Sequence, residues 1–385
     1  MSKTFWGYPR PDGSVGIRNH IAVISVMDNS NPVTRAVADA VKGAIYLPGS
    51  YIRGQLGADR AITLKVTAGL CLNPNIAGVV LIGLEPVTTK ELFDLIAPSG
   101  KPIEAVDIQG AGGTINAIAL GTRAAMRIAR TVSKIARREF PLSMLTLGLE
   151  CGGSDTTSGL ASNPSIGIVA DKFVAAGAKA IITETSEFFG AEHIFAERAA
   201  DRAVGQQFLD VIQSAEQDIM KQGVDLRGSN PTPDNIRGGL TTIEEKALGA
   251  MAKSGCSPLV GVLGYGDRPQ RAGLHFMAGP APAVESITGL AATGCQLAMF
   301  STGVGNPIGH PVMTVIKVSG NRNTIDTFSD NVDFDVTSVL EKNEAVDAAG
   351  SRLFDYALGV CSGELTTAEI LNVQESAISR FGLSM

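Results

Sequence analysis

Short runs of apolar and β-branched residues recur along the chain, separated by glycine-rich turns. Most of these runs are continuous rather than alternating, which is typical of strands that are buried on both faces of a parallel sheet. The runs occupy residues 21–26, 78–84, 145–147, 180–183, 259–263, 297–300 and 312–318. We therefore expect these segments to be the strands of the protein.

Helical patterns lie between these runs, and the clearest covers residues 114–138. Its apolar positions fall on one stripe, Thr114 is placed to cap the start, and basic residues at the end suit the helix dipole. Strand, glycine turn and helix in repetition predict an α/β fold. We expect two lobes with mainly parallel, helix-flanked sheets, the first lobe being Rossmann-like.

The length of 385 residues suggests two domains, since one domain usually takes about 150 residues. Residues 137–142 end the basic helix and place a proline before the next strand, so we expect the boundary near residue 140. The predicted domains are an N-terminal α/β lobe of residues 1–140 and a C-terminal α/β lobe of residues 141–385. A loop rich in glycine, proline and asparagine at residues 228–239 is long enough to suggest a functional role.

Composition excludes several classes of protein. Lysine and arginine number 32 against 38 acidic residues, a net charge of −6, and no basic run is present, which argues against nucleic-acid or membrane partners. The 5 cysteines are widely spaced without a C-x-x-C pair, and no apolar stretch is long enough to span a bilayer. These features predict a cytoplasmic protein. Neither a P-loop nor a G-x-G-x-x-G fingerprint follows a strand, so we expect no nucleotide cofactor.

Candidate chemistry follows the strands, because ligands of open α/β sheets bind at the carboxyl ends of strands. In residues 149–164 a strand runs into Cys151, two glycines, Ser154 and Asp155 at a probable helix start. Such a turn could seat an anionic substrate. Cys151 there would have a lowered pKa, as a nucleophile or a metal ligand. A small, packed and inert cysteine is the alternative, and the sequence leaves it open.

A second candidate segment, residues 183–193, places Glu184, Glu187 and Glu192 beside His193. Carboxylates beside an imidazole offer a general base, a general acid or metal ligands. Acidic residues in the first turn of a helix are also favoured by its dipole without any chemistry. We favour chemistry for Glu187 and His193, and leave the other two open.

Two further segments carry candidates for substrate binding. In residues 237–246 a capping box explains the threonines and glutamates. It does not explain Lys246, Arg237 or the nearby Asn235. The two cations suit a dianionic substrate, and a solvated surface pair is the alternative. A glycine-rich loop at residues 300–317 contributes Thr302 and His310. Both could contact substrate, although a loop histidine is often only hydrogen-bonded.

Several motifs together resemble the altronate/galactarate dehydratase family, in the same order and over nearly the whole chain. They occupy residues 7–20, 150–155, 163–164, 187–193, 238–246 and 301–303. Residues 47–59 and 83–86 are more similar to the sulfolactate sulfo-lyase branch than to the sugar-acid dehydratases. The resemblance implies that the C-terminal lobe is catalytic, and that the protein is a lyase. The implied reaction is β-elimination from a small acidic 2-hydroxy acid, with (2R)-sulfolactate ahead of altronate- or galactarate-type substrates. A ligand-binding relative without catalysis is the remaining alternative.

The sequence departs from the family at positions that suggest metal ligands. Asp28 and its neighbours stand where relatives carry a cysteine, Gly49 where they carry a histidine, and Leu84 where the dehydratases have another cysteine. The resemblance implies a divalent metal, Mg²⁺, Mn²⁺ or Fe²⁺, or else no metal at all. If a metal binds, we expect its ligands among Asp28, Glu85, Cys151 and His193.

Roles for the remaining candidates follow from the implied reaction, which removes a weakly acidic proton beside a carboxylate. The expected catalytic residues are Glu187, His193, Lys246 and Cys151. Cations for the two charged ends of the substrate are expected from Arg10, Arg18, Arg53 and Arg237. We expect Asp12, Cys151, Glu187, Arg237 and His310 to surround one polar cavity. Fused relatives carry a further small N-terminal domain, so the resemblance also implies a separate small subunit and an oligomer.

Overall fold

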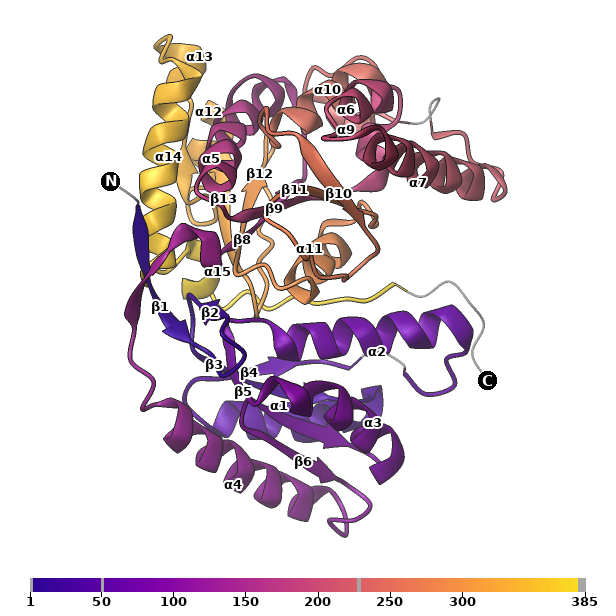
Figure 1. The fold of residues 1–385 in the computed structure, drawn as a ribbon, viewed down its shortest axis with the longest axis vertical. Coiled ribbons are helices and arrows are strands. Elements are labelled where there is room, and N and C mark those ends of the chain that lie inside the picture. The colour runs from indigo at the N-terminus through magenta and orange to yellow at the C-terminus, as the bar shows by residue number, and fades with distance from the viewer. Residues whose placement is uncertain (1–2, 50–51, 227–229, 380–385) are drawn as a thin grey trace.

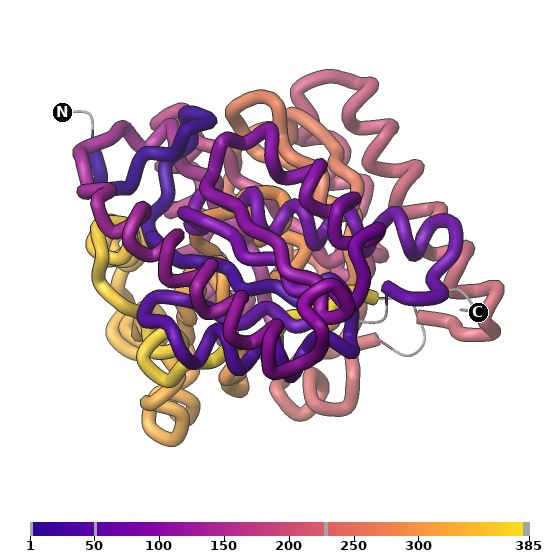
Figure 2. Tube along the Cα trace, turned by 90° about the horizontal axis from the view of Figure 1, so that it is seen from below, coloured from indigo at the N-terminus to yellow at the C-terminus, as the bar shows by residue number. Residues whose placement is uncertain are grey.

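The computed structural model describes residues 3–49, 52–226 and 230–379. It has two α/β lobes, each built on a parallel sheet with helices on its faces (Figure 1). The predicted fold class is thereby confirmed. Viewed from below, the N-terminal lobe lies in front of the C-terminal lobe (Figure 2).

The N-terminal lobe contains a four-stranded parallel sheet in the order β4-β3-β5-β6. Its strands are β3 (His20–Ser25), β4 (Ala44–Leu47), β5 (Ile76–Gly83) and β6 (Ile103–Asp107). Every residue of β5 is buried, as its continuous apolar run predicts. Helices α1 (Asn31–Ala40) and α4 (Thr114–Val132) cover one face, and α2 (Gly57–Leu72) and α3 (Pro86–Ile96) cover the other.

The C-terminal lobe contains a seven-stranded parallel sheet in the order β10-β11-β9-β8-β12-β13-β14. Its strands are β8 (Thr146–Cys151), β9 (Lys179–Ile182), β10 (Leu259–Leu263), β11 (Gly273–Met277), β12 (Leu297–Ser301), β13 (Thr314–Ser319) and β14 (Phe334–Asp335). Helices α5 (Asn163–Ala175) and α14 (Val346–Cys361) pack together on one face, while α11 (Ala283–Ala292) packs against β8 from the other.

Further helices and single turns connect the strands of the two lobes. The helices are α6 (Glu192–Glu197), α7 (Arg202–Met220), α9 (Pro233–Arg237), α10 (Ile243–Ala252), α12 (Arg322–Thr327), α13 (Ser338–Glu341) and α15 (Thr367–Ile370). Single turns are η1 (Asp28–Ser30), η2 (Ala97–Ser99), η3 (Leu142–Met144), the π-helical η4 (Ser158–Ser162) and η5 (Thr185–Phe188). Helix α9 lies inside the segment expected to be a long loop, of which residues 228 and 229 lie outside the described residues.

A small antiparallel sheet lies where the chain passes from one lobe to the other. In it β1 (Thr4–Pro9) pairs with β2 (Val15–Gly16) and with β7 (Arg138–Pro141). The helix expected over residues 114–138 therefore ends earlier, at Val132, because residues 138–141 pair with β1 instead. Its start is also different: Gly113 is the N-cap, with a φ of 115°, and Thr114 is already helical.

The two lobes share part of their hydrophobic core. Helix α2 of the first lobe packs against α11 of the second, and apolar side chains of both belong to one buried cluster. The helices approach closely at Gly69, where a Cβ atom would lie 2.6 Å from the Ala292 carbonyl oxygen. This packing fixes the two lobes against each other.

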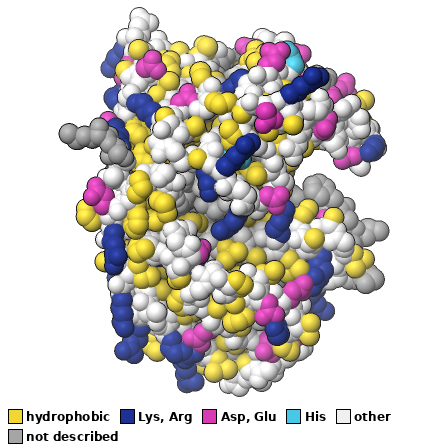
Figure 3. Space-filling model, viewed as in Figure 1, with side chains coloured by type: hydrophobic (Ala, Val, Ile, Leu, Met, Phe, Trp, Pro, Cys, Tyr) yellow, Lys and Arg dark blue, Asp and Glu magenta, His cyan; other side chains and the backbone are white. Residues whose placement is uncertain are grey.

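The surface agrees with the charge balance. On the face shown in Figure 3, lysine and arginine side chains are spread over both lobes and alternate with acidic ones. Within the described residues, no helix is both long and apolar enough to cross a membrane.

Candidate functional site

The candidate site lies at the carboxyl edge of the seven-stranded sheet. Cys151 ends β8 and pairs with Ser301 at the end of the adjacent strand β12, while Glu184 follows β9 on the other side. This is the edge at which open α/β sheets bind ligands. The turns after these strands therefore bring together residues that are far apart in the sequence.

A buried cation lies between two of these strand ends. Lys253, directly after α10, places its Nζ 2.9 Å from Cys151 Sγ and 2.6 Å from Glu184 Oε2. The same carboxylate oxygen accepts a hydrogen bond of 3.1 Å from the Cys151 backbone N–H. The Lys253 and Glu184 side chains are only 0% and 3% exposed. We call Lys253 and Glu184 the inner ion pair.

Burial determines the charge states in this region. It raises the pKa of the Glu150 carboxyl well above its usual value, and the Glu184 carboxylate raises it further. For Lys253, burial lowers the pKa, but Cys151, Glu184 and Glu150 together more than offset this and the pKa is raised. Lys253 is thus a cation that pairs with Glu184, and burial favours the neutral form of Glu150. Burial also raises the pKa of Glu184, and the Lys253 charge acts against this. Within this cluster the charge of Lys253 is therefore balanced by that of Glu184.

A second ion pair lies closer to the surface. Lys246 Nζ is 2.9 Å from Glu187 Oε1, and it donates to Asn230 Oδ1 at 2.9 Å. The other oxygen, Glu187 Oε2, is buried and has no hydrogen-bond partner within the described residues. We call Lys246 and Glu187 the outer ion pair. It combines a cation with a carboxylate that keeps one oxygen free of hydrogen bonds within the described residues.

A cavity of about 330 Å³ lies beside Lys246 of the outer ion pair. Its wall includes Lys246 and the hydroxyl-bearing residues Ser154, Thr156 and Ser158. The Ser154 hydroxyl lies 3.9 Å from Cys151 Sγ, so this wall also adjoins the thiol that contacts the inner ion pair. Thr156 and Ser158 already donate their hydroxyls to the carbonyl oxygens of Gly238 and Asp155, so the cavity offers an anionic guest the Ser154 hydroxyl and the Lys246 ammonium.

Asp155 and Asn235 hold the cavity wall in place. Asp155 accepts hydrogen bonds from the Ser158 N–H, the Thr157 hydroxyl and the Asn321 side-chain amide. At the helix start that we expected to seat an anion, the Ser158 N–H is thus taken by the Asp155 carboxylate. Asn235 donates to the Ser154 carbonyl oxygen at 2.9 Å. It also forms a capping box with Thr232, so capping does account for this residue.

The structure corrects the predicted state of Cys151. Burial and the neighbouring Glu184 carboxylate raise the pKa of the Cys151 thiol, whereas the sequence suggested a lowered one. The helical segment of residues 156–175, which runs through η4 into α5, does not activate it, because the Asp155 carboxylate accepts the Ser158 N–H at its start. Cys151 is a buried thiol that contacts the inner ion pair.

Cysteine alkylation tests this environment. At neutral pH we expect iodoacetamide to label the native protein at Cys256, the exposed cysteine, and to leave the four buried cysteines unlabelled. Peptide mass spectrometry would locate the label, with Cys256→Ser as the unlabelled control. Rapid labelling of Cys151 that substrate prevents would instead support thiol chemistry.

Several other predicted residues lie away from this edge. His193 is exposed in the first turn of α6 and lines a surface depression with Glu197 and Arg202. Arg53 is exposed. Arg237 is also exposed and pairs with Asp234 on α9. The structure therefore does not bring these three side chains to the buried ion pairs.

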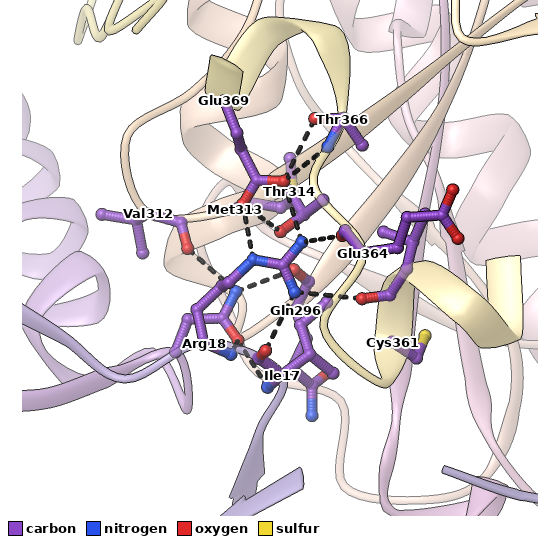
Figure 4. Close-up of polar contacts among 12 residues, drawn as sticks. Ile17, Arg18, Gln296, Val312, Met313, Thr314, Cys361, Glu364, Thr366 and Glu369 are labelled. Atoms are coloured by element: carbon purple, nitrogen blue, oxygen red, sulfur yellow. Dashed lines mark hydrogen bonds and ion pairs between the residues drawn. The ribbon is translucent and has the colours of Figure 1, made fainter. Parts of the chain in front are cut away.

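Arg10 and Arg18 make contacts within the protein. Arg10 donates to the carbonyl oxygens of Pro74 and Arg18 and to Asn19 Oδ1. Arg18 forms a two-bond ion pair with Glu369, and also donates to backbone carbonyls of distant segments (Figure 4). These contacts favour structural roles for both arginines.

The expectation of one cavity lined by all five marker residues was wrong. Asp12 lies in an exposed turn between β1 and β2. His310 precedes β13, at the amino edge of the sheet, and lines a separate cavity of about 160 Å³. Burial lowers the pKa of His310 to about 3, so its ring is neutral. Thr302 does lie at the carboxyl edge, where its hydroxyl accepts the Gly305 N–H.

The predicted metal ligands do not form a site. Within residues 3–49, 52–226 and 230–379, no three His, Cys, Asp or Glu side chains are grouped to hold a metal ion. The Glu85 carboxylate caps α3 by accepting two backbone N–H groups, and His193 is exposed. Between Cys151 and Glu184 the Lys253 ammonium occupies the position that a cation would need. The set of Asp28, Glu85, Cys151 and His193 therefore does not fit a metal centre.

Sequence reasoning missed Lys253, Glu150 and Ser286. The Ser286 hydroxyl donates a hydrogen bond of 2.6 Å to Glu150 Oε2. Ser286 belongs to α11, which covers the face of the sheet opposite to α5 and α14. Two signals were available. Glu150 interrupts an otherwise apolar strand, and Lys253 follows Lys246 by seven residues, which is two helical turns and places both on the same side of α10.

Comparisons with known proteins agree with this architecture. Residues 7–133 match the family described as D-galactarate dehydratase/altronate hydrolase, second domain, and residues 142–384 match D-galactarate/altronate dehydratase, C-terminal. The chain is 41% identical to (2R)-sulfolactate sulfo-lyase subunit beta of Chromohalobacter salexigens, with 98% of this chain and 97% of that relative aligned. It is 30% identical to altronate dehydratase of Bacillus subtilis, covering 100% of this chain and 79% of the relative. Galactarate dehydratase (L-threo-forming) of Escherichia coli is 29% identical, covering 94% and 74%. The chain therefore belongs to the galactarate/altronate dehydratase family and is a lyase.

Proposed function

We propose that this protein is the large subunit of a lyase that converts (2R)-sulfolactate to pyruvate and sulfite. The observation that carries the proposal is the 41% identity to a sulfo-lyase subunit along almost all of both chains. The dehydratase relatives are less similar and are covered only to 74–79% of their length. A sugar-acid hydro-lyase is the second candidate.

The outer ion pair supports the first step of this reaction. The free oxygen Glu187 Oε2 takes the proton from carbon 2, and the Lys246 ammonium stabilises the negative charge that develops on the substrate carboxylate. The electron pair of the broken C–H bond forms the carbon–carbon double bond. The C–S bond breaks and its electrons leave with sulfite.

The remaining steps balance the reaction. The resulting enol takes a proton at carbon 3 and loses its hydroxyl proton, giving pyruvate. Sulfite is a stable anion and needs no proton in order to leave, whereas hydroxide, the leaving group of a dehydratase, does need one. A site with one carboxylate base and no histidine beside it therefore suits a sulfonate better than a hydroxyl leaving group.

The cavity supports an acidic substrate of small size. The Ser154 hydroxyl, whose only polar contact within the described residues is a long one of 3.9 Å to Cys151 Sγ, can donate to a sulfonate oxygen, while Lys246 remains beside the carboxylate end. No step is assigned to a divalent metal, because the candidate ligands are not grouped. The metal content of the purified protein is an independent measurement for the same experiment.

We also propose a partner. The relative with 41% identity is named subunit beta, and the longer dehydratases extend beyond the part that this chain covers. By analogy with that relative, the working enzyme would be an assembly of this chain with a separate small subunit.

A substrate panel tests the proposal. We expect the purified protein with its co-expressed small subunit to release sulfite and pyruvate in equal amounts from (2R)-sulfolactate. Reactions with altronate and galactarate, each with and without added divalent ions or a chelator, serve as comparisons. A 2-keto-3-deoxy acid from a sugar acid would favour the hydro-lyase. Thermal stabilisation by a ligand without any product would indicate a binding protein, and would contradict the lyase.

A further inference from the structure

The inner and outer ion pairs are built from the same two segments. Helix α10 and the residue after it supply Lys246 and Lys253, and the segment after β9 supplies Glu184 and Glu187. The N–O distances are 2.6 Å in the inner pair and 2.9 Å in the outer pair. Both pairs are buried, but the inner pair is completely enclosed, whereas Lys246 is 10% exposed and lines the cavity.

These segments connect the two pairs mechanically. Lys246 lies on α10 and Lys253 directly follows it, so the two lysines are two helical turns apart on the same face. On the other side, the Glu187 N–H donates to the Glu184 carbonyl oxygen at 2.9 Å, which closes the turn between the two glutamates. A shift of Glu184 relative to Lys253 therefore changes the position of Glu187 relative to Lys246.

The backbone at Glu184 needs this anchorage. Its φ is 71° and its ψ is 72°, a left-handed conformation that residues other than glycine rarely adopt. The carboxylate is held by Lys253 and by the Cys151 N–H, and the next residue, Thr185, donates its N–H to the Gly279 carbonyl oxygen. The side-chain contacts of Glu184 thus hold the turn that presents Glu187.

We propose that Lys253 and Glu184 are positioning residues of the lyase reaction. Neither lines the cavity, but together they fix the Thr185–Phe188 turn against α10 and thereby hold Glu187 and Lys246 in reactive geometry. This inference rests on the proposed function for its kinetic consequences. It assigns a role in catalysis to a buried pair that could otherwise serve stability alone.

The experiment separates stability from positioning by removing both charges. The variants are Glu184→Gln, Lys253→Met and the double variant, each measured for Tm, kcat and KM with (2R)-sulfolactate and with substrate deuterated at carbon 2. The matched control is the double variant Arg18→Met with Glu369→Gln. It removes a second buried ion pair that does not belong to the candidate site.

We expect each single variant to lower Tm strongly, since it leaves one buried charge unpaired, and the double variant to recover most of that loss. We expect kcat of the double variant to remain lower by on the order of 100-fold with KM within about threefold, because misplaced reacting groups cost about this much. Its deuterium isotope effect on kcat should rise. In the control, the kcat of the folded protein and its isotope effect should stay unchanged.

Other results would overturn the inference. Wild-type kcat in the folded double variant would show that the pair serves stability alone. The same conclusion would follow if activity fell only in proportion to the fraction of unfolded protein and the isotope effect stayed unchanged. If the wild type proves inactive on every substrate, the proposed function fails. Tm alone then tests whether the inner ion pair is coupled to the outer ion pair. Glu187→Gln should change Tm by different amounts in the wild-type and double-variant backgrounds, and equal changes would overturn the positioning role.

Discussion

Glu187→Gln should lower kcat by about 10³-fold, because a positioned general base typically contributes 10²–10⁴-fold and an amide cannot take the proton. The substitution keeps the size of the side chain and an oxygen that can still accept from Lys246. We therefore expect the fold and KM to change little. Steady-state release of sulfite and pyruvate gives kcat and KM, and the thermal unfolding curve shows whether the fold is kept.

Two controls make this result specific. Glu197→Gln, on the exposed side of α6, removes a carboxylate of the same type and should leave kcat unchanged. His193→Gln removes the other base candidate from the same sequence motif. If His193→Gln abolished turnover and Glu187→Gln did not, the base would be His193, and the outer ion pair would have no catalytic role.

The sequence predicted the interior of the fold better than its edges. Strands β5, β8, β12 and β13 are almost entirely buried, and such strands are continuous apolar runs that are visible without a structure. By contrast, only Phe5 and Gly7 are buried in β1 and no residue is buried in β7, and the two strands pair with each other across more than a hundred residues. Pairing over such a distance is not determined by local pattern, so Arg138 was wrongly placed in a helix.

The candidate site divides in the same way. Glu187, Lys246 and Ser154 were found because they follow strands or start a helix, and those positions can be predicted from periodicity. Lys253 was missed because a lysine becomes informative only when it is known to be buried, and its burial depends on Glu184, a residue 69 positions away. Arg18 was assigned to substrate for the opposite reason. Its sequence motif does not reveal that a carboxylate of the same chain, Glu369, already neutralises it.

Arg18→Met should destabilise the protein by about 3–5 kcal/mol, the usual cost of removing one partner of a buried ion pair. Arg18 Nε and Nη2 lie 2.6 Å and 2.8 Å from the two Glu369 oxygens, and the two side chains are 6% and 18% exposed. The guanidinium also donates to the Ile17 and Val360 carbonyl oxygens. The substitution would leave Glu369 as a largely buried carboxylate without its cation. It would also remove the hydrogen bond that joins residue 18 to the Val360 carbonyl oxygen near the end of α14.

The same pair predicts how stability depends on pH. Burial raises the pKa of Glu369, but hydrogen bonds and charge from Arg18 more than offset this, and the pKa is lowered overall. Because the folded pKa lies below the unfolded value of about 4.3, the pair stabilises the protein above that pH. The contribution is lost as pH falls through the folded pKa.

Urea unfolding at pH 7 and pH 4 would measure both effects. The wild type should lose part of its free energy of unfolding on acidification, and Glu369→Gln should lose less over the same interval. The double variant Arg18→Met with Glu369→Gln should be more stable than Arg18→Met alone, since it has no unpaired charge. If Arg18→Met had wild-type stability at pH 7, the guanidinium would be dispensable for the fold, and the structural role assigned to Arg18 would be wrong.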